Sequence, residues 1–348
     1  MSMVYSGDTI QDTDGGVLRP ISSVMRNRII NGGMVISQRN AGASVTPTTN
    51  TYTLDRWQAY TGGLSSKFSV QQNAGSVTPP AGYINYLGVT SLSSYTSGAS
   101  DYLAIVQNIE GLNCTDLGWG TANAKTVTLS FWVRSSLTGT FGGSLLNSAY
   151  NRSYPFTYTI SSANTWTQAS ITIAGDTTGT WLTTNGVGIR IWFNLGTGSA
   201  LSGTAGAWAV GEYENATGSV AVTATSGATF YITGVQLEVG SSATGFEYRQ
   251  YGQELQLCQR YYETGGFVNS VQFCSTVSNA TTYFVTIPFI VTKRSVPTVV
   301  NTNVNSNAFA GTASTASPSA TEVRNNRTSN GSSPNGYFGD SWTASAEL

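Results

Sequence analysis

The stretch from residue 228 to residue 262 constrains this chain most, because its hydrophobic period changes halfway along. Over residues 229–239, alternate side chains fall into two sets that would point to opposite sides of an extended chain. One set is Tyr231, Val235, Leu237 and Val239. The other set is Phe230, Ile232, Gln236 and Glu238. A period of two predicts a β-strand. Gly240-Ser-Ser then interrupts the pattern. A β-domain is therefore expected to end at about residue 245.

A short helix is expected after this break. Four side chains recur at i, i+4, i+7 and i+11, which are Tyr251, Leu255, Cys258 and Tyr262. Gly265-Gly266 supplies the stop signal. A stripe one side chain wide suits a three-way helix bundle on a common axis. The alternative, equally compatible with so short a helix, is that it lies on its own domain.

Length and charge limit the class of protein. A chain of 348 residues suggests two domains. Only 9% of the residues are charged and the net charge is −1, whereas about a quarter of a typical globular chain is charged. The polar surface must consist of Ser, Thr, Asn, Gln and Gly. Attraction of nucleic acid or membrane lipid by charge is excluded.

The sequence contains no histidine, which removes the commonest general base and the commonest metal ligand. Cys114, Cys258 and Cys274 are odd in number and lack CxxC spacing, as expected for free thiols in a protein assembled in a reducing cytosol. The N-terminal residues MSMVYSGDTI lack a basic region followed by an apolar run, so no signal peptide is expected. No apolar run is long enough to span a membrane.

Residues 28–245 are predicted to form an antiparallel β-sandwich, with a jelly roll as the favoured form. Short alternating runs follow one another between Gly/Ser/Thr/Asn loops, without helical stretches between them. These runs are Phe68 and Val70, Leu103 to Ile109, Val127–Val133, Tyr154–Ile160, Ala169–Ile173, Val187–Phe193, Val220 and Val222, and 229–239. The polar residues 1–27 ahead of them are predicted to be an extended arm, either disordered or ordered against a partner.

A connector over residues 246–264 leads to a second, smaller β-domain at residues 265–348. Its clearest strand alternates from Tyr283 to Val291, and Pro288 within it favours an edge or a bulge. Residues 301–335 are nearly all Asn, Ser, Thr, Ala and Gly, which predicts loop. So few large apolar residues make a thin core, and symmetric association would remedy that.

Several phrases carry a family resemblance. They are VQLEVG…ATGFEYRQYGQELQLCQRYYE at the domain junction, Arg28–Arg39, Tyr52–Trp57 and Thr343–Leu348. Together they resemble tail-fibre-like virion proteins of tailed bacteriophages, especially phages of marine and α-proteobacterial hosts. Because the phrases lie near both ends and in the middle, the resemblance spans nearly the whole chain.

The resemblance implies a homotrimeric virion protein. Residues 1–27 would attach to other virion proteins, residues 265–348 would form the distal, trimerising tip, and the partner would be a host-surface glycan. The resemblance leaves a head fibre or spike open as an alternative. A polysaccharide-binding module or depolymerase is the second alternative.

Asn31-Gly-Gly and the closing run from Thr229 to Leu237 also resemble the ends of carbohydrate-binding jelly rolls of the galactose-binding type. Many of those hold a structural calcium with a carboxylate from the last strand. Here Thr233-Gly234 stands where an acidic pair is usual, so the chain departs from the calcium-binding pattern. No cofactor is predicted.

Two strands present a tryptophan beside an arginine on the side away from the core. Inward alternation of 127–133 and 187–193 leaves five outward candidates for carbohydrate binding, which are Trp132, Arg134, Arg190, Trp192 and Asn194. An indole stacks on the apolar face of a sugar, and Arg or Asn binds hydroxyl groups. Alternatively, both tryptophans lie under a loop or in a subunit contact. Second-rank candidates are Trp166, Trp181, Trp208 and Tyr213.

A hydrolase would need two opposed carboxylates. The available acids are scattered, namely Asp101, Glu110, Asp116, Asp176, Glu212 and Glu214. Glu212 and Glu214 share a face if the segment is extended, but their neighbours predict a loop. No nucleophile motif or phosphate loop accompanies them, so the chain is predicted not to be an enzyme.

Overall fold

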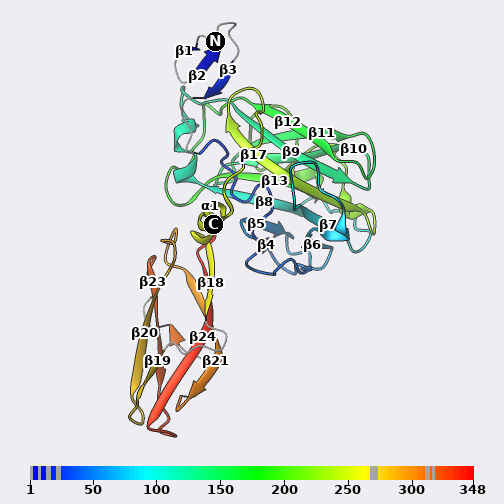
Figure 1. The fold of residues 1–348 in the computed structure, drawn as a ribbon. Coiled ribbons are helices and arrows are strands. Elements are labelled where there is room, and N and C mark those ends of the chain that lie inside the picture. The colour runs from blue at the N-terminus through cyan, green and yellow to red at the C-terminus, as the bar shows by residue number, and fades with distance from the viewer. Residues whose placement is uncertain are drawn as a thin grey trace.

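The structure is a computed structural model that describes residues 3–6, 9–12, 17–20, 25–266, 273–309, 314–315 and 318–348. Within these residues the chain is almost all β, with antiparallel sheets and one α-helix, which confirms the predicted fold class (Figure 1). That helix has nine residues, and no helix among the described residues is long and apolar enough to cross a membrane.

Two antiparallel sheets form the central sandwich. The seven-stranded sheet has the order β15 (Ala209–Val210), β11 (Arg152–Ile160), β10 (Gly139–Leu146), β13 (Val187–Thr197), β8 (Tyr102–Glu110), β5 (Trp57–Tyr60) and β4 (Thr51–Leu54). The five-stranded sheet has the order β12 (Thr167–Ile173), β9 (Val127–Ser135), β17 (Thr229–Val239), β7 (Leu87–Ser91) and β6 (Phe68–Gln72).

The connections give the sandwich its jelly-roll character. From β7 onward the chain crosses to the other sheet at β8, returns at β9, crosses again for β10 and β11, and alternates once more through β12 and β13. The remaining short elements lie in the connections and are β14 (Ser202–Gly203), β16 (Asn215–Ala216), η1 (Ala74–Ser76), η2 (Gly111–Asn113), η3 (Thr115–Leu117), η4 (Ser199–Leu201) and η5 (Val222–Ala224).

The sandwich core is built from the inward positions that alternation predicts. Leu129, Phe131 and Val133 of β9 are buried opposite Ile191 and Phe193 of β13. The rings of Phe131 and Phe193 meet edge to face across the two sheets, with centroids 5.1 Å apart. Period-two alternation thus fixes which side of each strand enters the core.

Residues ahead of the sandwich form a small antiparallel sheet where an extended arm is predicted. Its strands are β1 (Met3–Ser6), β2 (Thr9–Asp12) and β3 (Val17–Pro20). Other parts of the predicted arm, at 1–2, 7–8, 13–16 and 21–24, lie outside the described residues. Asn27 already belongs to the sandwich, because its backbone N–H donates to Glu247 Oε2 at 2.9 Å and its Nδ2 donates to Val235 O at 3.1 Å.

The helix α1 (Tyr251–Gln259) corrects the predicted bundle stripe of Tyr251, Leu255, Cys258 and Tyr262. Cys258 is fully buried in a cluster with Ile30, Ile36 and Tyr261 of the same chain, and Leu255 packs against that cluster. Tyr251 is 64% exposed, and Tyr262 lies beyond the helix at the start of β18. Leu255 and Cys258 therefore pack on their own domain, and the four residues do not form one stripe that could line a three-way axis.

The C-terminal unit contains two further sheets. In the first, β24 (Asn335–Ser345) pairs with β18 (Tyr262–Gly266), β19 (Phe273–Thr276) and β21 (Thr298–Asn307). In the second, β23 (Glu322–Thr328) lies between β20 (Thr282–Pro288) and β22 (Ser314–Thr315). Pro288 ends an edge strand, as predicted. The loop predicted over residues 301–335 is wrong, because this stretch supplies most of β21, β22 and β23.

Free thiols are found at two of the three cysteines. Cys114 and Cys258 are unbridged and buried. The side chain of Cys274 lies outside the described part of the chain.

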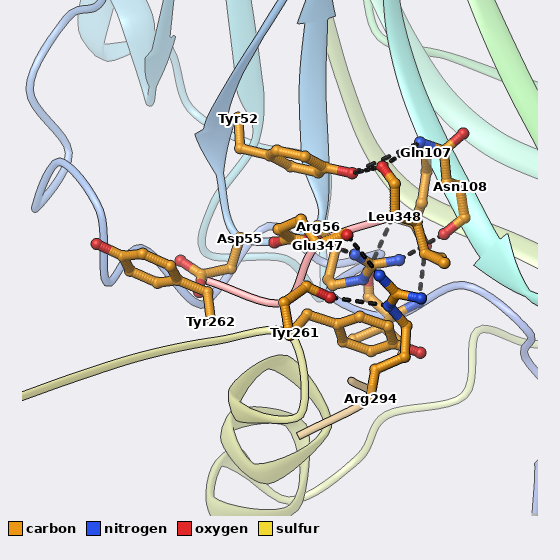
Figure 2. Close-up of polar contacts among 12 residues, drawn as sticks. Tyr52, Asp55, Arg56, Gln107, Asn108, Tyr261, Tyr262, Arg294, Glu347 and Leu348 are labelled. Carbon is orange, nitrogen blue, oxygen red and sulfur yellow. Dashed lines mark hydrogen bonds and ion pairs between the residues drawn. The ribbon is translucent and has the colours of Figure 1, made fainter. Parts of the chain in front are cut away.

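A buried polar junction joins the C-terminal unit to the sandwich (Figure 2). Arg56, in the turn between β4 and β5, is 1% exposed and forms an ion pair with Glu347. Its guanidinium lies 3.6 Å from the centre of the Tyr261 ring and donates to the Asn108 carbonyl. Arg39 reaches the same carboxylate, with 2.7 Å between Arg39 Nη2 and Glu347 Oε1.

Arg294 of the C-terminal unit also links the end of the chain to the sandwich. Arg294 Nε donates to Ala346 O and Arg294 Nη2 to Glu347 O, each at 2.8 Å. Arg294 Nη1 donates to Asn185 O of the sandwich at 2.7 Å. The C-terminal unit therefore contacts the sandwich at the connector, at Arg294 and at residues 346–348.

We predict that Glu347→Ala destabilises the chain by about 3–5 kcal/mol, because the Arg56 guanidinium would stay buried without its carboxylate. Urea unfolding of the full chain measures the loss. The control is Asp116→Ala. This substitution should cost about 0–1 kcal/mol, because the Asp116 carboxylate that pairs with Arg28 is 48% exposed. Equal losses in the two variants would contradict a junction held by Arg56 and Glu347.

Candidate functional site

The five predicted binding residues fall on opposite faces of the sandwich. Trp132 and Arg134 belong to β9 of the five-stranded sheet, whereas Arg190, Trp192 and Asn194 belong to β13 of the seven-stranded sheet. Both sets point away from the main core, as alternation predicts. The structure does not bring the two sets together, so they cannot form one site.

On the five-stranded face, Trp132 and Arg134 are partly exposed. The Trp132 indole lies beside the Tyr83 hydroxyl. Arg134 Nε donates to Asn164 O at 2.9 Å, and its guanidinium lies 5.4 Å from the centre of the Tyr231 ring.

A groove of about 200 Å³ opens next to this face. Tyr83, Phe246 and Tyr248 line it, with ring centroids 5.0–5.8 Å apart. The charged side chains that line it, Glu247, Arg249 and Glu254, are ion-paired with one another. The groove therefore offers mainly ring surface to a ligand.

On the seven-stranded face, Trp192 lies at the centre of a cluster of aromatic rings. The Tyr60 ring centroid is 4.7 Å from that of Trp192, and the Tyr102 centroid is 5.7 Å away. These neighbours, on β5 and β8, leave Trp192 without exposed surface. The prediction of an exposed Trp192 is thus wrong, and Asn194, at 1% exposure, is buried too. Tyr102 and Tyr150 are the rings of this cluster that stay partly exposed.

Arg190 forms the basic end of this face. Its Nη1 donates to Asn108 Oδ1 at 2.8 Å and to the Tyr60 hydroxyl at 3.4 Å. The guanidinium lies 4.5 Å from the centre of the Tyr150 ring. Because Asn108 also contacts residues 56 and 348, the face and the junction in Figure 2 share one polar side chain.

Glu214 forms the acidic end. Its backbone N–H donates to Leu201 O at 2.8 Å, which positions the segment leading into β16 over β10 and β13. The side chain is 1% exposed and its Oε2 has no hydrogen-bond partner. Burial, helped by the nearby Glu212 carboxylate, raises the pKa of Glu214 to about 8. Burial also raises the pKa of Tyr102, and the Glu214 and Glu212 carboxylates add to that rise.

Buried polar atoms without hydrogen-bond partners gather on and beside this face. Among the described residues they include Gln58 Oε1, Arg190 Nε, Trp192 Nε1, Asn194 Oδ1, Glu214 Oε2 and Asn215 Oδ1. Buried polar groups in folded proteins are nearly always paired, so such a group marks a place for water or ligand. Here donors and acceptors lie beside aromatic rings. This arrangement suits a ligand that combines hydroxyl groups with apolar C–H faces.

The second-rank aromatic candidates anchor loops. Trp181 and Trp208 meet Trp119 edge to face, with centroids 4.8 and 5.3 Å from it. Trp208 Nε1 donates to Ala174 O at 2.7 Å, and Trp166 Nε1 donates to Thr78 O at 2.9 Å. Tyr213 lies against Gly203, between β14 and β16.

The residues at the calcium position of galactose-binding jelly rolls do not fit a calcium ion. Thr233 Oγ1 donates to Asn85 O at 2.7 Å, and Gly234 contributes no side chain. The Tyr83 ring fills the space beside Gly234, where an added Cβ would come within 2.6 Å of it. Calcium prefers several carboxylate and carbonyl oxygens. Among the described residues no group of three acidic, histidine or cysteine side chains could hold a metal.

The sequence pattern does not indicate several residues that the structure places on the seven-stranded face. Tyr102 alternates with the core residues Leu103 and Ile105 of β8, so alternation alone would place it on the outer face. Tyr60 and Tyr150 lie in other strands or turns, and nothing local in the sequence indicates that they meet Trp192. In the sequence Glu214 is one of several scattered acids, and its neighbours predict only a loop.

No family model and no curated protein matches the chain. Three of the similar solved structures are the enzymatically active domain of tailspike protein 4 of bacteriophage CBA120, TmCBM61 in complex with β-1,4-galactotriose, and the CBM22-1 xylan-binding domain of Paenibacillus barcinonensis Xyn10C. Their identities are 12%, 12% and 10%, and their TM-scores 0.33, 0.32 and 0.27. The alignments cover 62%, 62% and 59% of this chain and 22%, 99% and 99% of those chains.

We predict that Glu214→Gln makes stability less dependent on pH. With its pKa raised from 4.5 to about 8, the folded-state carboxyl keeps a proton that the unfolded chain has lost. Its contribution therefore falls as pH rises through this window, by up to about 1.4 kcal/mol per pH unit. The charged and titratable groups around Glu214 are Glu212, Tyr102 and Tyr150, and the Arg190 guanidinium acts on both Glu212 and Tyr150.

The measurement is the free energy of unfolding of both proteins between about pH 5 and pH 9. The wild type should lose stability relative to the variant as pH increases. Parallel curves for the two proteins would show that Glu214 is ionised in the folded state.

Proposed function

We propose that this protein is a non-catalytic phage virion fibre protein that binds host-surface glycans through the outer face of the seven-stranded sheet. The observation that carries the proposal is the meeting, on one face, of aromatic rings with buried donors and acceptors that lack partners. Sugars present this combination of hydroxyl groups and apolar faces.

The geometry supports binding rather than hydrolysis. Glu212 and Glu214 are two residues apart in one short segment, where Glu212 is exposed and Glu214 is buried. Glycoside hydrolysis needs carboxylates on the two sides of the scissile bond.

The virion assignment is supported by the sequence phrases shared with tail-fibre-like proteins at residues 28–39, 52–57 and 235–263. In such a particle, residues 1–27 would attach to other virion proteins. Each chain would bind its glycan weakly, and several chains on one particle would raise the avidity.

A trimeric assembly would use the C-terminal unit, because α1 is covered by its own domain. Large apolar side chains are exposed in this unit, namely Phe284, Ile290, Val296 and Val300. Three copies could bury them against one another, which would thicken a core that is small in one chain.

We predict that Tyr102→Ala and Tyr150→Ala each lower glycan affinity about tenfold or more, since each removes a ring that stays partly exposed beside Trp192. A glycan array with the wild type identifies a ligand, and titration calorimetry then compares the variants. Circular dichroism confirms that the variants are folded.

The matched control is Trp132→Ala on the opposite face, which should leave affinity unchanged. Loss of binding in the Trp132 variant alone would move the site to the five-stranded sheet and its groove. Release of new reducing ends from host polysaccharide would overturn the non-catalytic assignment.

We predict a particle of three times the 36.7 kDa chain mass in light scattering after gel filtration. Replacing Phe284 and Val300 with serine should shift the mass toward that of one chain, because both side chains are exposed in the isolated chain. A wild-type protein that runs with the mass of one chain would contradict the trimer.

A further inference from the structure

We infer that the glycan bound by the seven-stranded face carries a free amino group, whose ammonium is held by Glu214 and Glu212 beside the Tyr102 ring. This inference rests on the proposed function and specifies the ligand of the same site. It makes the ligand class an amino sugar with an unacetylated amine.

The first support is the state of Glu214. Its side chain is 1% exposed, and Oε2 makes no hydrogen bond. None of the ion pairs among the described residues includes Glu214 or Glu212. A buried carboxyl without a partner is costly. An incoming cation is the group that relieves this cost most directly.

The second support is the aromatic surrounding of this acidic end. The rings of Tyr60, Tyr102 and Trp192 lie within 4.7–6.4 Å of one another, measured between centroids. Aromatic faces attract ammonium groups, and the attraction grows where water is excluded. Carboxyl groups beside such rings therefore favour a compact cation over a neutral group.

The third support is that the arginine of the face is already committed elsewhere. Arg190 donates to Asn108 and Tyr60 and lies over the Tyr150 ring. Burial raises the pKa of Glu212 and the nearby Arg190 guanidinium opposes that rise, yet no ion pair in the described part of the chain joins Arg190 to Glu212 or Glu214.

Other sugar classes fit the acidic end less well. A uronate would place its carboxylate beside two carboxyl groups. An N-acetylated amine is bulkier and carries no charge, so it can hydrogen-bond to Glu214 but gains no charge attraction from it. We therefore expect the order of affinity to be free amine, then N-acetyl, then uronate.

Binding should also release a proton. The Glu214 carboxyl holds its proton at neutral pH in the free protein, because its pKa is about 8. An ammonium placed beside it stabilises the carboxylate, so the proton leaves for solvent. Calorimetry in two buffers of different ionisation enthalpy measures this release directly.

The experiment uses the full chain with glucosamine oligomers and their fully N-acetylated counterparts of equal length, titrated near neutral pH. We expect the free-amine oligomers to bind about tenfold more tightly or better, with proton release. Glu214→Gln should bring the ratio of the two affinities to about one. The control Glu322→Gln, an exposed acid in the C-terminal unit, should change neither affinity.

An added arm with N-α-acetyl-lysine amide separates an amino sugar from a bare ammonium group, and weaker binding of this probe supports the sugar. Equal affinity for free-amine and N-acetylated oligomers, with loss of both in Tyr102→Ala, would overturn the amine inference and leave the proposed function standing. The proton count in the wild type does not depend on any variant, so no proton release with free-amine oligomers would also overturn it. Absence of glycan binding of any kind would instead refute the proposed function.

Discussion

The contact between Arg56 and Glu347 holds this architecture together. Burying a guanidinium is costly, and here the cost is offset by a carboxylate, the Tyr261 ring and the Asn108 carbonyl at once. Each of these partners comes from a different part of the chain. In a sequence with only 9% charged residues, this concentration of charge fixes one orientation of the C-terminal unit on the sandwich. Asn108 also accepts a hydrogen bond from Arg190, so it links the seven-stranded face to this junction.

The sandwich could be predicted because its strands alternate so regularly. Phe131 and Phe193 show which side enters the core without any knowledge of partners. Residues 301–335 could not be predicted in this way. Their many Asn residues have low strand preference, and pairing with β24 and β20 overrides it. Asn325 is buried there and donates to Asn301 Oδ1 at 2.9 Å, a contact that composition does not reveal. Likewise, the spacing of apolar side chains predicts the helix at 251–259 but does not show that Cys258 packs against Ile30 and Ile36.

The site was predicted only in part, for a related reason. Parity correctly places Trp132 and Trp192 outside the main core, but parity carries no information about which sheet a strand joins. β9 and β13 join different sheets, so the two tryptophans lie on opposite sides of the molecule. The burial of Trp192 depends on Tyr60 and Tyr102 from strands distant in sequence. Glu214 lies in an aperiodic segment, where local pattern predicts neither burial nor the absence of a partner.

The attachment of the C-terminal unit has a mechanical consequence. The small sheet β1–β3 and the C-terminal unit lie at opposite ends of the long axis of the molecule (Figure 1). A force applied between these ends is shared by the connector, Arg294 and residues 346–348, which act in parallel. A single linker would act as a swivel, whereas three anchorage points resist torque and bending. The joint between the sandwich and the C-terminal unit can therefore transmit tension without turning.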